Sequence, residues 1–276
     1  MTSLPWRGDI RAEVEAIRSL GTWSELTLSL SPPLVAEPGQ FVHVYCDGNR
    51  ILRRPFSIFG LEEEGKRLKL LVKPRGGGST WLVSRKVGEG IDLIGPLGRG
   101  FPLQGKRVAL VAGGIGIAPL AYLAKRLRDS GCQVSIFWGL SELDEAGSLP
   151  HELGRECELY LSVEKNLWPE KGPACARAVN VGTVLDLFSR YQGNFDVVYA
   201  CGPRSMYVEW FKDLSKVPSV PVYLSWEERM ACGIGACLGC SVPVRGAGRL
   251  YARACREGPV FLCDEIDWER VDTIGP

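Results

Sequence analysis

Histidine is nearly absent from this sequence of 276 residues, which contains only two. They are His43 and His151, far apart along the chain, so a histidine-rich metal centre and histidine-dependent hydrolysis are both disfavoured. Net charge is also small, because 33 lysines and arginines balance 32 aspartates and glutamates. Since there is no strong field of one sign, we expect no binding to nucleic acid and none to an anionic membrane.

Long hydrophobic runs are also missing. The first residues lack the continuous apolar stretch of a signal peptide. The longest uncharged run, residues 108–124, approaches the lower length limit of a membrane span. Three glycines and a proline divide that run into a buried strand, a turn and the start of a helix. We therefore expect no membrane segment and a cytoplasmic protein.

Glycine and cysteine are plentiful by contrast. The chain has 33 glycines, about 12% against a usual share near 7%, which suggests tight turns where the backbone approaches a ligand. Its ten cysteines are too few per residue for a secreted disulfide scaffold. Five of them fall after residue 230, whereas the others are scattered among apolar or mixed stretches.

Residues 1–102 have the pattern of a β domain. Alternating polarity predicts strands at 23–30, 40–46 and 66–73, and glycine- and proline-rich turns separate them. Several short strands punctuated in this way favour an antiparallel barrel.

Residues 103–226 alternate between apolar strands and helices, which predicts a parallel sheet in an α/β domain. The expected strands are 107–112, 132–138, 158–163, 195–200 and 220–224, and the expected helices are 117–130, 184–190 and 204–216. In such sheets ligands bind beyond the carboxyl ends of the strands. Residues 227–276 form a third part that is rich in glycine and cysteine and has little helical periodicity.

The cysteines of the third part have a distinctive spacing. Four residues separate the first from the second, two separate the second from the third, and a fourth follows after fourteen more. This is the spacing of plant-type 2Fe–2S ligation. The glycines between them allow unusual φ values and let backbone N–H groups approach the sulfurs. The predicted ligands are Cys232, Cys237, Cys240 and Cys255.

A structural zinc site and inert buried thiols are the alternatives. Zinc usually takes paired Cys-x2–4-Cys knuckles, and only one tight pair is present here, so a 2Fe–2S cluster is favoured. For the fourth ligand Cys255 is preferred to Cys263, because residues 259–263 have the pattern of an ordinary buried strand.

Arg54-Pro55-Phe56-Ser57 follows one expected strand and begins another. This run resembles the flavin motif of the ferredoxin–NADP reductase superfamily. The resemblance implies that the arginine meets the pyrophosphate of FAD, the aromatic ring lies by the isoalloxazine and the serine reaches flavin N5. Phenylalanine stands where tyrosine is commoner, so stacking survives without a phenolic hydrogen bond. A solvated arginine before a strand is the plain alternative.

A glycine-rich segment leads into an expected short helix at 81–86. Glycines before a helix N-terminus make a favourable pyrophosphate cradle, because free N–H groups and the helix dipole face the anion. The alternative is a flexible hairpin loop. The residues assigned to the cofactor here are Gly77, Gly78, Ser79 and Thr80.

A second glycine loop lies between an apolar strand and a helix, at Gly113, Gly114, Gly116 and Pro119. Small residues there let a dinucleotide pyrophosphate approach the helix start. The loop does not fit G-x-G-x-x-G strictly, but it closely resembles the nucleotide loop of the same superfamily. A close-packed strand–helix turn is the alternative.

Cys201-Gly202-Pro203 follows the expected strand 195–200. In the superfamily that it resembles, a Cys-Gly segment at this place lies near the nicotinamide and the flavin, which makes Cys201 a candidate catalytic residue and Gly202 and Pro203 candidate cofactor contacts. No base is near in sequence, so Cys201 is not expected to be a nucleophile. A buried cysteine at a strand end is the alternative.

Carboxylates follow the second parallel strand, at Glu142, Asp144 and Glu145, and no arginine accompanies them. A carboxylate suits the ribose hydroxyls of NAD, whereas NADP prefers an arginine for its phosphate. The sequence therefore favours NAD.

The order of barrel, nucleotide domain and C-terminal cysteines narrows the resemblance. Residues 227–240 and 255–261 are similar to the electron-transfer subunits of NAD-dependent bacterial dihydroorotate dehydrogenases. That likeness implies FAD, a 2Fe–2S cluster, NAD and an FMN-containing catalytic subunit, in a heterotetramer with two copies of each chain. A hydride carries two electrons and the cluster accepts one at a time, so a flavin must stand between NAD and the cluster. Residues 166–179 match nothing in that family.

The sequence leaves two other functions open. One is a diaphorase subunit of a hydrogenase or of a ferredoxin:NADP oxidoreductase complex, which would share the three-part layout. The other is a non-catalytic redox sensor, which would have no need of the Arg54 motif or the Gly113 loop.

Overall fold

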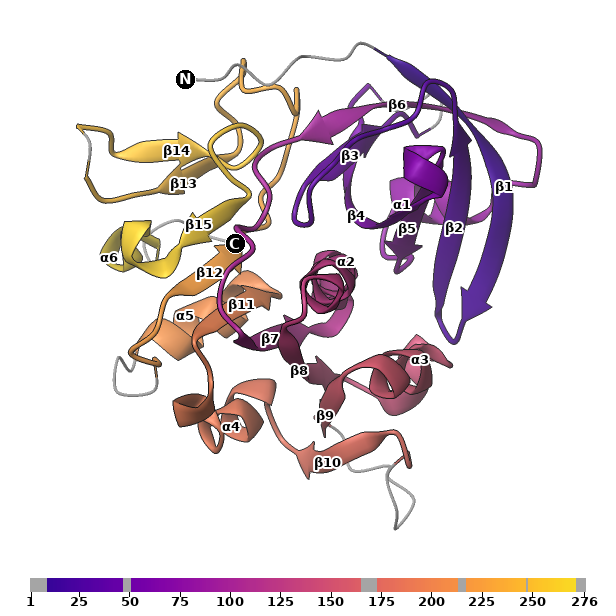
Figure 1. Ribbon diagram of the computed structural model, residues 1–276. Coiled ribbons are helices and arrows are strands. Elements are labelled where there is room, and N and C mark those ends of the chain that lie inside the picture. The colour runs from indigo at the N-terminus through magenta and orange to yellow at the C-terminus, as the bar shows by residue number, and fades with distance from the viewer. Residues whose placement is uncertain (1–8, 47–50, 165–172, 213–216, 247, 272–276) are drawn as a thin grey trace.

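The computed structural model describes residues 9–46, 51–164, 173–212, 217–246 and 248–271. It contains a closed barrel, a seven-stranded sheet and a small two-stranded sheet, in the order that the sequence predicts. Figure 1 shows the barrel in indigo and purple, the large sheet below it and the last part of the chain in yellow beside both.

The barrel is antiparallel throughout and closes in the order β1-β2-β5-β4-β3-β6. Apolar residues alternate along its strands, so every second side chain enters a core that includes Val14, Leu28 and Leu70. Helix α1 (Gly77–Val83) lies between the last two strands in sequence. The barrel strands are β1 (Ile10–Leu20), β2 (Trp23–Leu30), β3 (Phe41–Val44), β4 (Arg54–Glu62), β5 (Arg67–Val72) and β6 (Gly90–Leu97).

The large sheet has the order β10-β9-β8-β7-β11-β12-β15, and all its neighbours are parallel except the last pair. Its strands are β7 (Arg107–Gly113), β8 (Gln133–Leu140), β9 (Glu158–Val163), β10 (Ala176–Val181), β11 (Val197–Cys201), β12 (Val222–Ser225) and β15 (Val260–Leu262). Its helices are α2 (Ile117–Asp129), α3 (Leu149–Glu156), α4 (Val184–Ser189) and α5 (Arg204–Lys212).

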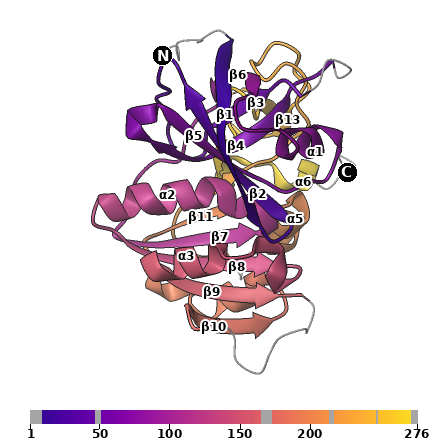
Figure 2. The same ribbon diagram turned by 90° about the vertical axis from the view of Figure 1, so that its right-hand side faces the viewer.

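Both faces of this sheet are covered, which explains its nearly continuous apolar strands. Along β7, Val108 and Leu110 pack into the core beneath α2 and α3, whereas Ala109 and Val111 pack beneath α4 and α5. In Figure 2, α2 lies between the barrel above and the sheet below. The hydroxyl of Tyr122 on α2 donates to the carbonyl of Ala36 at 3.0 Å, which ties the sheet domain to the barrel.

The third part does not stand apart from the other two. Strand β15 pairs antiparallel with β12 at the edge of the large sheet, and the amide of Arg99 donates to the carbonyl of Gly258 at 2.6 Å. The third part therefore packs on both preceding domains, and the boundary at residue 226 crosses a shared sheet. Its other elements are β13 (Ser241–Pro243), β14 (Tyr251–Arg253) and α6 (Trp268–Val271).

Some elements differ from the sequence prediction. Helix α1 begins at Gly77 rather than at residue 81, so the glycines form its first turn instead of preceding it. Residues 176–179, part of the unmatched segment 166–179, belong to edge strand β10, whereas 166–172 lie outside the described residues. The expected helix 204–216 is described as far as Lys212.

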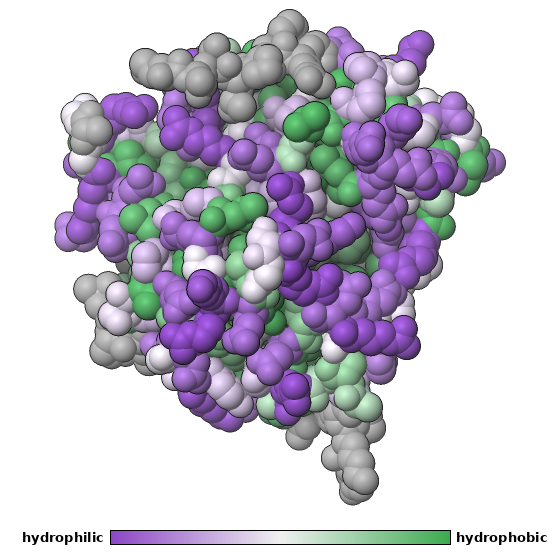
Figure 3. Space-filling view, in the orientation of Figure 1, coloured by the Kyte–Doolittle hydropathy of each residue, from purple (hydrophilic) through white to green (hydrophobic). Residues whose placement is uncertain are grey.

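The uncharged run 108–124 divides into β7, a short turn and α2, as predicted. No helix in the described part of the chain is long and apolar enough to cross a membrane. On the face shown in Figure 3, hydrophilic residues predominate and hydrophobic ones form separate patches.

Replacing Phe261 with alanine tests how far the third part supports the large sheet. Phe261 on β15 is 5% exposed and packs in the same core as α4 and α5. We expect the variant to lose about 3–5 kcal/mol of unfolding free energy, measured by denaturant unfolding, with one transition for the whole protein. Tyr251→Ala, at a 49% exposed position, is the control and should change little. A nucleotide domain of unchanged stability in Phe261→Ala would contradict this prediction.

Candidate functional site

The cysteine loop, residues 232–240 after β12, has backbone conformations that favour glycine. Gly233 and Gly235 have φ of 70° and 84°, in the left-handed region, as expected from their positions between the cysteines. The amides of Ala236 and Cys237 point at Cys232 Sγ, with N–S distances of 3.3 and 3.4 Å. Backbone N–H groups therefore face a sulfur, the arrangement that stabilises a thiolate.

The four predicted ligands fall into two pairs. Cys240 Sγ and Cys255 Sγ lie 3.2 Å apart, and the hydrogen bond between them lowers the pKa of the Cys240 thiol and raises that of Cys255, so the pair shares one proton. Burial alone would raise the pKa of Cys232, but hydrogen bonds from the Cys237 amide, its neighbours and the Cys237 thiol lower it to about 7. Two thiols are thus prepared to ionise, and the thiolate is the form that binds metal.

This pairing fits two irons better than one zinc ion. A structural zinc site gathers four ligands around one ion. Two pairs of thiols match the sharing of four cysteines between two irons.

Cys263, the alternative fourth ligand, has another hydrogen-bond partner. Its thiol is buried just after β15 and donates to Asp264 Oδ1 at 3.3 Å. Burial raises the pKa of this thiol to about 12. Cys255 therefore stays the predicted fourth ligand.

Sequence reasoning missed the side chain that holds the loop, Arg253 on β14. Its Nη1 donates to the carbonyl of Gly235 at 2.7 Å, and its Nε donates to Glu257 at 2.9 Å. The hydrogen bond with Glu257 is the main reason that the pKa of Arg253 is raised, and Cys255 and Cys240 raise it further through their charge. A fixed positive charge thus lies close to two ligand thiols.

Strand β4 places the predicted flavin motif against helix α1. The side chain of Arg54 occupies the space that a Cβ on Gly78 would fill, since its Cγ lies 2.8 Å from that point. Glycine at 78 therefore allows a guanidinium and the first turn of a helix to lie together, which suits a pyrophosphate. Ser79 Oγ accepts from the amides of Arg75 and Gly76, so it caps its own helix. Thr80 lies in the same helix.

The remaining motif residues lie on β4 opposite β3. Pro55 pairs with His43, Phe56 with Val42 and Ser57 with Phe41. Phe56 is only partly buried, which leaves part of its ring available to stack on a flat ligand. The residues present fit a flavin dinucleotide, and their contacts with it stay predictions.

The second glycine loop meets the segment after β11. A Cβ on Gly116 would lie 2.1 Å from the carbonyl oxygen of Cys201, and one on Gly113 would lie 2.8 Å from Pro203. These glycines are needed for close packing, and they also line a pocket with Gly114, Gly202 and Pro203. The sequence predicted all five residues at one site, and they do come together. Pro119 is buried in α2 and is not part of the lining.

Cys201 itself is the last residue of β11 and is 1% exposed. Burial raises the pKa of its thiol far above the usual value. A thiol held protonated is no nucleophile, in line with the sequence analysis. Its predicted place beside nicotinamide and flavin stays a prediction.

The pocket contains acids that the sequence analysis did not single out. Glu227, directly after the buried Trp226, lines it together with Arg75 of the barrel, so all three parts of the chain contribute. The side chain of Glu227 is exposed to the pocket. Desolvation by the surrounding protein raises the pKa of its carboxyl, and the positive charge of Arg75 offsets part of this shift. An acidic residue two positions beyond an apolar strand was the available signal.

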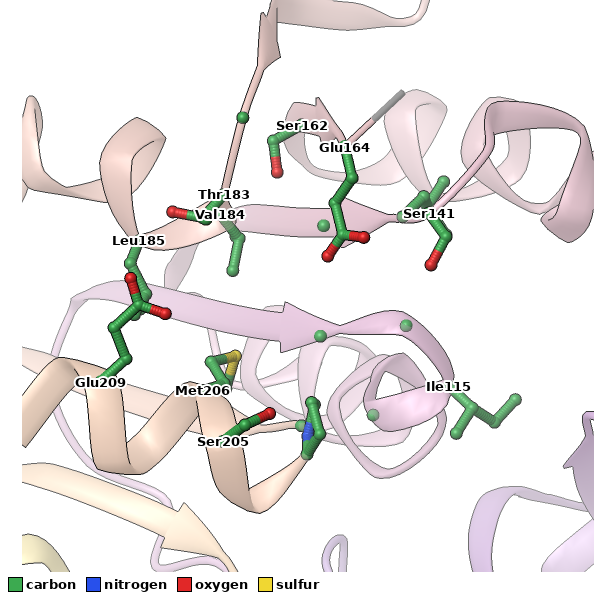
Figure 4. Close-up of a pocket in the computed structure, with 18 of the residues that line it drawn as sticks. Ile115, Ser141, Ser162, Glu164, Thr183, Val184, Leu185, Ser205, Met206 and Glu209 are labelled. Carbon is green, nitrogen blue, oxygen red and sulfur yellow. The ribbon is translucent and has the colours of Figure 1, made fainter. Parts of the chain in front are cut away.

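Two further carboxylates line the pocket, Glu164 and Glu209 of α5, whereas none of the three predicted after β8 does so. Glu164 follows β9, and Figure 4 shows it extending over the same space as Ser141 and Ser162. The hydroxyl of Ser162 is buried without a hydrogen-bond partner. Glu145, one of the predicted acids, is instead buried in an ion pair with Lys73. The other two, Glu142 and Asp144, are exposed and outside the lining.

Comparisons with known proteins agree with this geometry. Residues 227–267 match the family model described as the iron–sulfur cluster binding domain of dihydroorotate dehydrogenase B. The chain is 38% identical over 231 residues to the electron transfer subunit of dihydroorotate dehydrogenase B (NAD(+)) from Caldanaerobacter subterraneus, covering 83% of this chain and 86% of that one. The same subunit from a Geobacillus species is 38% identical over 249 residues, covering 87% and 91%.

Solved structures share the whole fold. The NADH-dependent reduced ferredoxin–NADP oxidoreductase superposes with a TM-score of 0.80 at 25% identity, covering 95% of this chain and 91% of that one. Phthalate dioxygenase reductase superposes with a TM-score of 0.62 at 18% identity, covering 87% of each chain. The barrel, the sheet and the arrangement between them are therefore those of ferredoxin–NADP reductase-like proteins.

Exchanging single cysteines for serine distinguishes the two candidates for the fourth ligand. Cys255→Ser should lose most of the iron, because one pair of thiols is broken, whereas the matched variant Cys263→Ser should keep it. Iron and acid-labile sulfide are measured on anaerobically purified protein, with the visible spectrum as a second readout. The reverse pattern would assign the ligand to Cys263, and iron loss in neither variant would exclude both.

Proposed function

The chain belongs to the family of electron transfer subunits of NAD-dependent dihydroorotate dehydrogenase B, and we propose that it passes electrons between a catalytic partner and NAD through a cluster and a flavin. In this reaction dihydroorotate is oxidised to orotate, a step of pyrimidine biosynthesis, on the partner. The observation that carries the proposal is the pairing of the thiols of Cys240 and Cys255, 3.2 Å apart, within the segment that matches the family model.

Each part of the chain has its own task. Residues 1–102 would bind FAD, with Arg54 and the first turn of α1 at the pyrophosphate. Residues 103–226 would bind NAD, with the Gly113–Gly116 turn at its pyrophosphate and Gly202 near the nicotinamide. Residues 227–276 would hold the 2Fe–2S cluster through Cys232, Cys237, Cys240 and Cys255. Bound FAD would exchange both a hydride and single electrons, whereas NAD exchanges only the hydride and the cluster only single electrons.

The protein's own contribution is positioning. The glycines at 113 and 116 let the nucleotide loop approach the end of β11, so a nicotinamide bound there would face the barrel. Glu227 enters the same pocket and is available to hold a proton or to accept a hydrogen bond at the reacting end.

The surface of the cysteine loop suits contact with a partner. Cys237 is exposed, and so are its neighbours Ile234 and Leu238, the latter at 62%. Apolar side chains exposed beside a redox centre favour docking of a protein that exchanges electrons there. We assign this face to an FMN-containing catalytic subunit, in a heterotetramer with two copies of each chain.

A coupled assay tests the proposal. The flavin-loaded, anaerobic chain is mixed with NADH, which should bleach both flavin and cluster absorbance. With an FMN-containing dihydroorotate dehydrogenase subunit added, dihydroorotate should reduce NAD, and neither chain alone should do so. The alternative is a diaphorase subunit of a hydrogenase or of a ferredoxin:NADP oxidoreductase complex, which would share this fold. Reduction of NAD by hydrogen or by reduced ferredoxin in such a complex, and not by dihydroorotate, would support that alternative.

Replacing Glu164 tests the choice of nicotinamide nucleotide. A carboxylate at the pocket end would repel the 2′-phosphate of NADP, so Glu164→Arg should raise the ratio of kcat/KM for NADPH to that for NADH by about tenfold or more. Glu142→Arg, at an acid outside the pocket, is the matched control and should leave the ratio unchanged. Flavin reduction is followed by stopped flow. An effect at residue 142 and none at 164 would return the role to the acids after β8.

A further inference from the structure

His43 lies where the flavin-binding strand meets the cysteine loop. Its neighbours on β3, Val42 and Val44, point into the barrel core. Side chains alternate along a strand, so His43 points out of the barrel. On β4 it is paired with Pro55, inside the predicted flavin motif. Although it faces outward, His43 is 0% exposed, because the third part of the chain covers it.

The covering residue is Gly233, which directly follows the predicted ligand Cys232. A Cβ on Gly233 would lie 2.4 Å from His43 Nδ1 and 3.0 Å from its Cε1. The imidazole thus occupies the place of the missing side chain. The loop that carries Cys232 is therefore fitted against the barrel wall at this ring.

Both ring nitrogens of His43 lack a well-formed hydrogen bond. The backbones of Arg53 and Cys232 also face the ring, but neither meets the geometry of a hydrogen bond with it. An imidazole carries at least one N–H whatever its protonation state, so the ring has a donor to satisfy. A buried donor is seldom left without an acceptor in a folded protein, so an acceptor is implied where the ring meets the cysteine loop at Gly233.

We propose that His43 is a positioning residue for electron transfer, which seats the loop at Gly233 and donates its N–H to a sulfur of the cluster that Cys232 helps to hold. The inference rests on the proposed cluster. Hydrogen bonds to cluster sulfurs raise the reduction potential. The same contact fixes the separation of the cluster from the flavin-binding strand. His43 would thus influence both how readily and how quickly the cluster accepts an electron.

The presence of only two histidines allows a direct test on the unaltered protein. The chain is labelled with 15N-histidine, the cluster is reduced with dithionite, and pulsed electron paramagnetic resonance is recorded. We expect a weak 15N coupling to the cluster, retained in His151→Gln, whose altered residue is exposed on α3. A cluster signal without 15N coupling, or a coupling only to a flavin radical, would overturn the inference. Loss of the cluster signal itself would instead refute the proposed function.

A variant pair measures the consequence. His43→Phe keeps a flat ring but has no N–H, and it should weaken electron acceptance by the cluster about tenfold, equal to a fall of about 59 mV in its potential. Cluster reduction after NADH should slow, whereas flavin reduction by NADH should not. Phe41→Leu, on the same outward face of β3, is the packing control and should leave the potential unchanged.

An unchanged potential in His43→Phe, at full flavin and iron content, would contradict the inference. Should that variant fail to retain iron, the labelled wild-type protein still decides, because its measurement needs no substitution at position 43.

Discussion

Electron transfer between two bound groups depends on a short and fixed separation, and here that separation is set by the return of the chain's last part onto both earlier domains. Strand β15 extends the nucleotide sheet at β12, Gly258 bonds to Arg99 beside the barrel, and Gly233 presses on His43. The cysteine loop is consequently attached on two sides. A cluster on a freely hinged segment would have no defined distance to a flavin.

The same closeness explains why glycine dominates the site. At Gly78, Gly116 and Gly233 a single methyl group would collide with Arg54, with the Cys201 carbonyl and with His43 respectively. The first two collisions lie between elements of one domain, and the third lies where the cysteine loop meets the barrel. Glycine thus serves here less for flexibility than for contact between elements that must approach closely.

The sequence predicted the elements and motifs with strong local patterns. The strands β2 and β9 were predicted to the residue, and the cysteine spacing pointed to a binuclear centre, because ligand spacing reflects the loop that must surround it. What the sequence did not reveal depends on tertiary packing. Glu164 and Glu227 are ordinary acids until the ends of different strands bring them to one pocket, and His43 is unremarkable until Gly233 covers it. The three-residue strand β15 joins its sheet from far along the chain, and periodicity does not indicate such pairing.

The central claim is that four thiols hold two irons beside a flavin site. Iron and sulfide analysis of the anaerobically purified chain, combined with Mössbauer and paramagnetic resonance spectra before and after one-electron reduction, tests it most directly. The account predicts two irons and two sulfides per chain, no resonance when oxidised and a single spin-one-half signal when reduced. One zinc ion per chain, or iron without sulfide and without that signal, would contradict it.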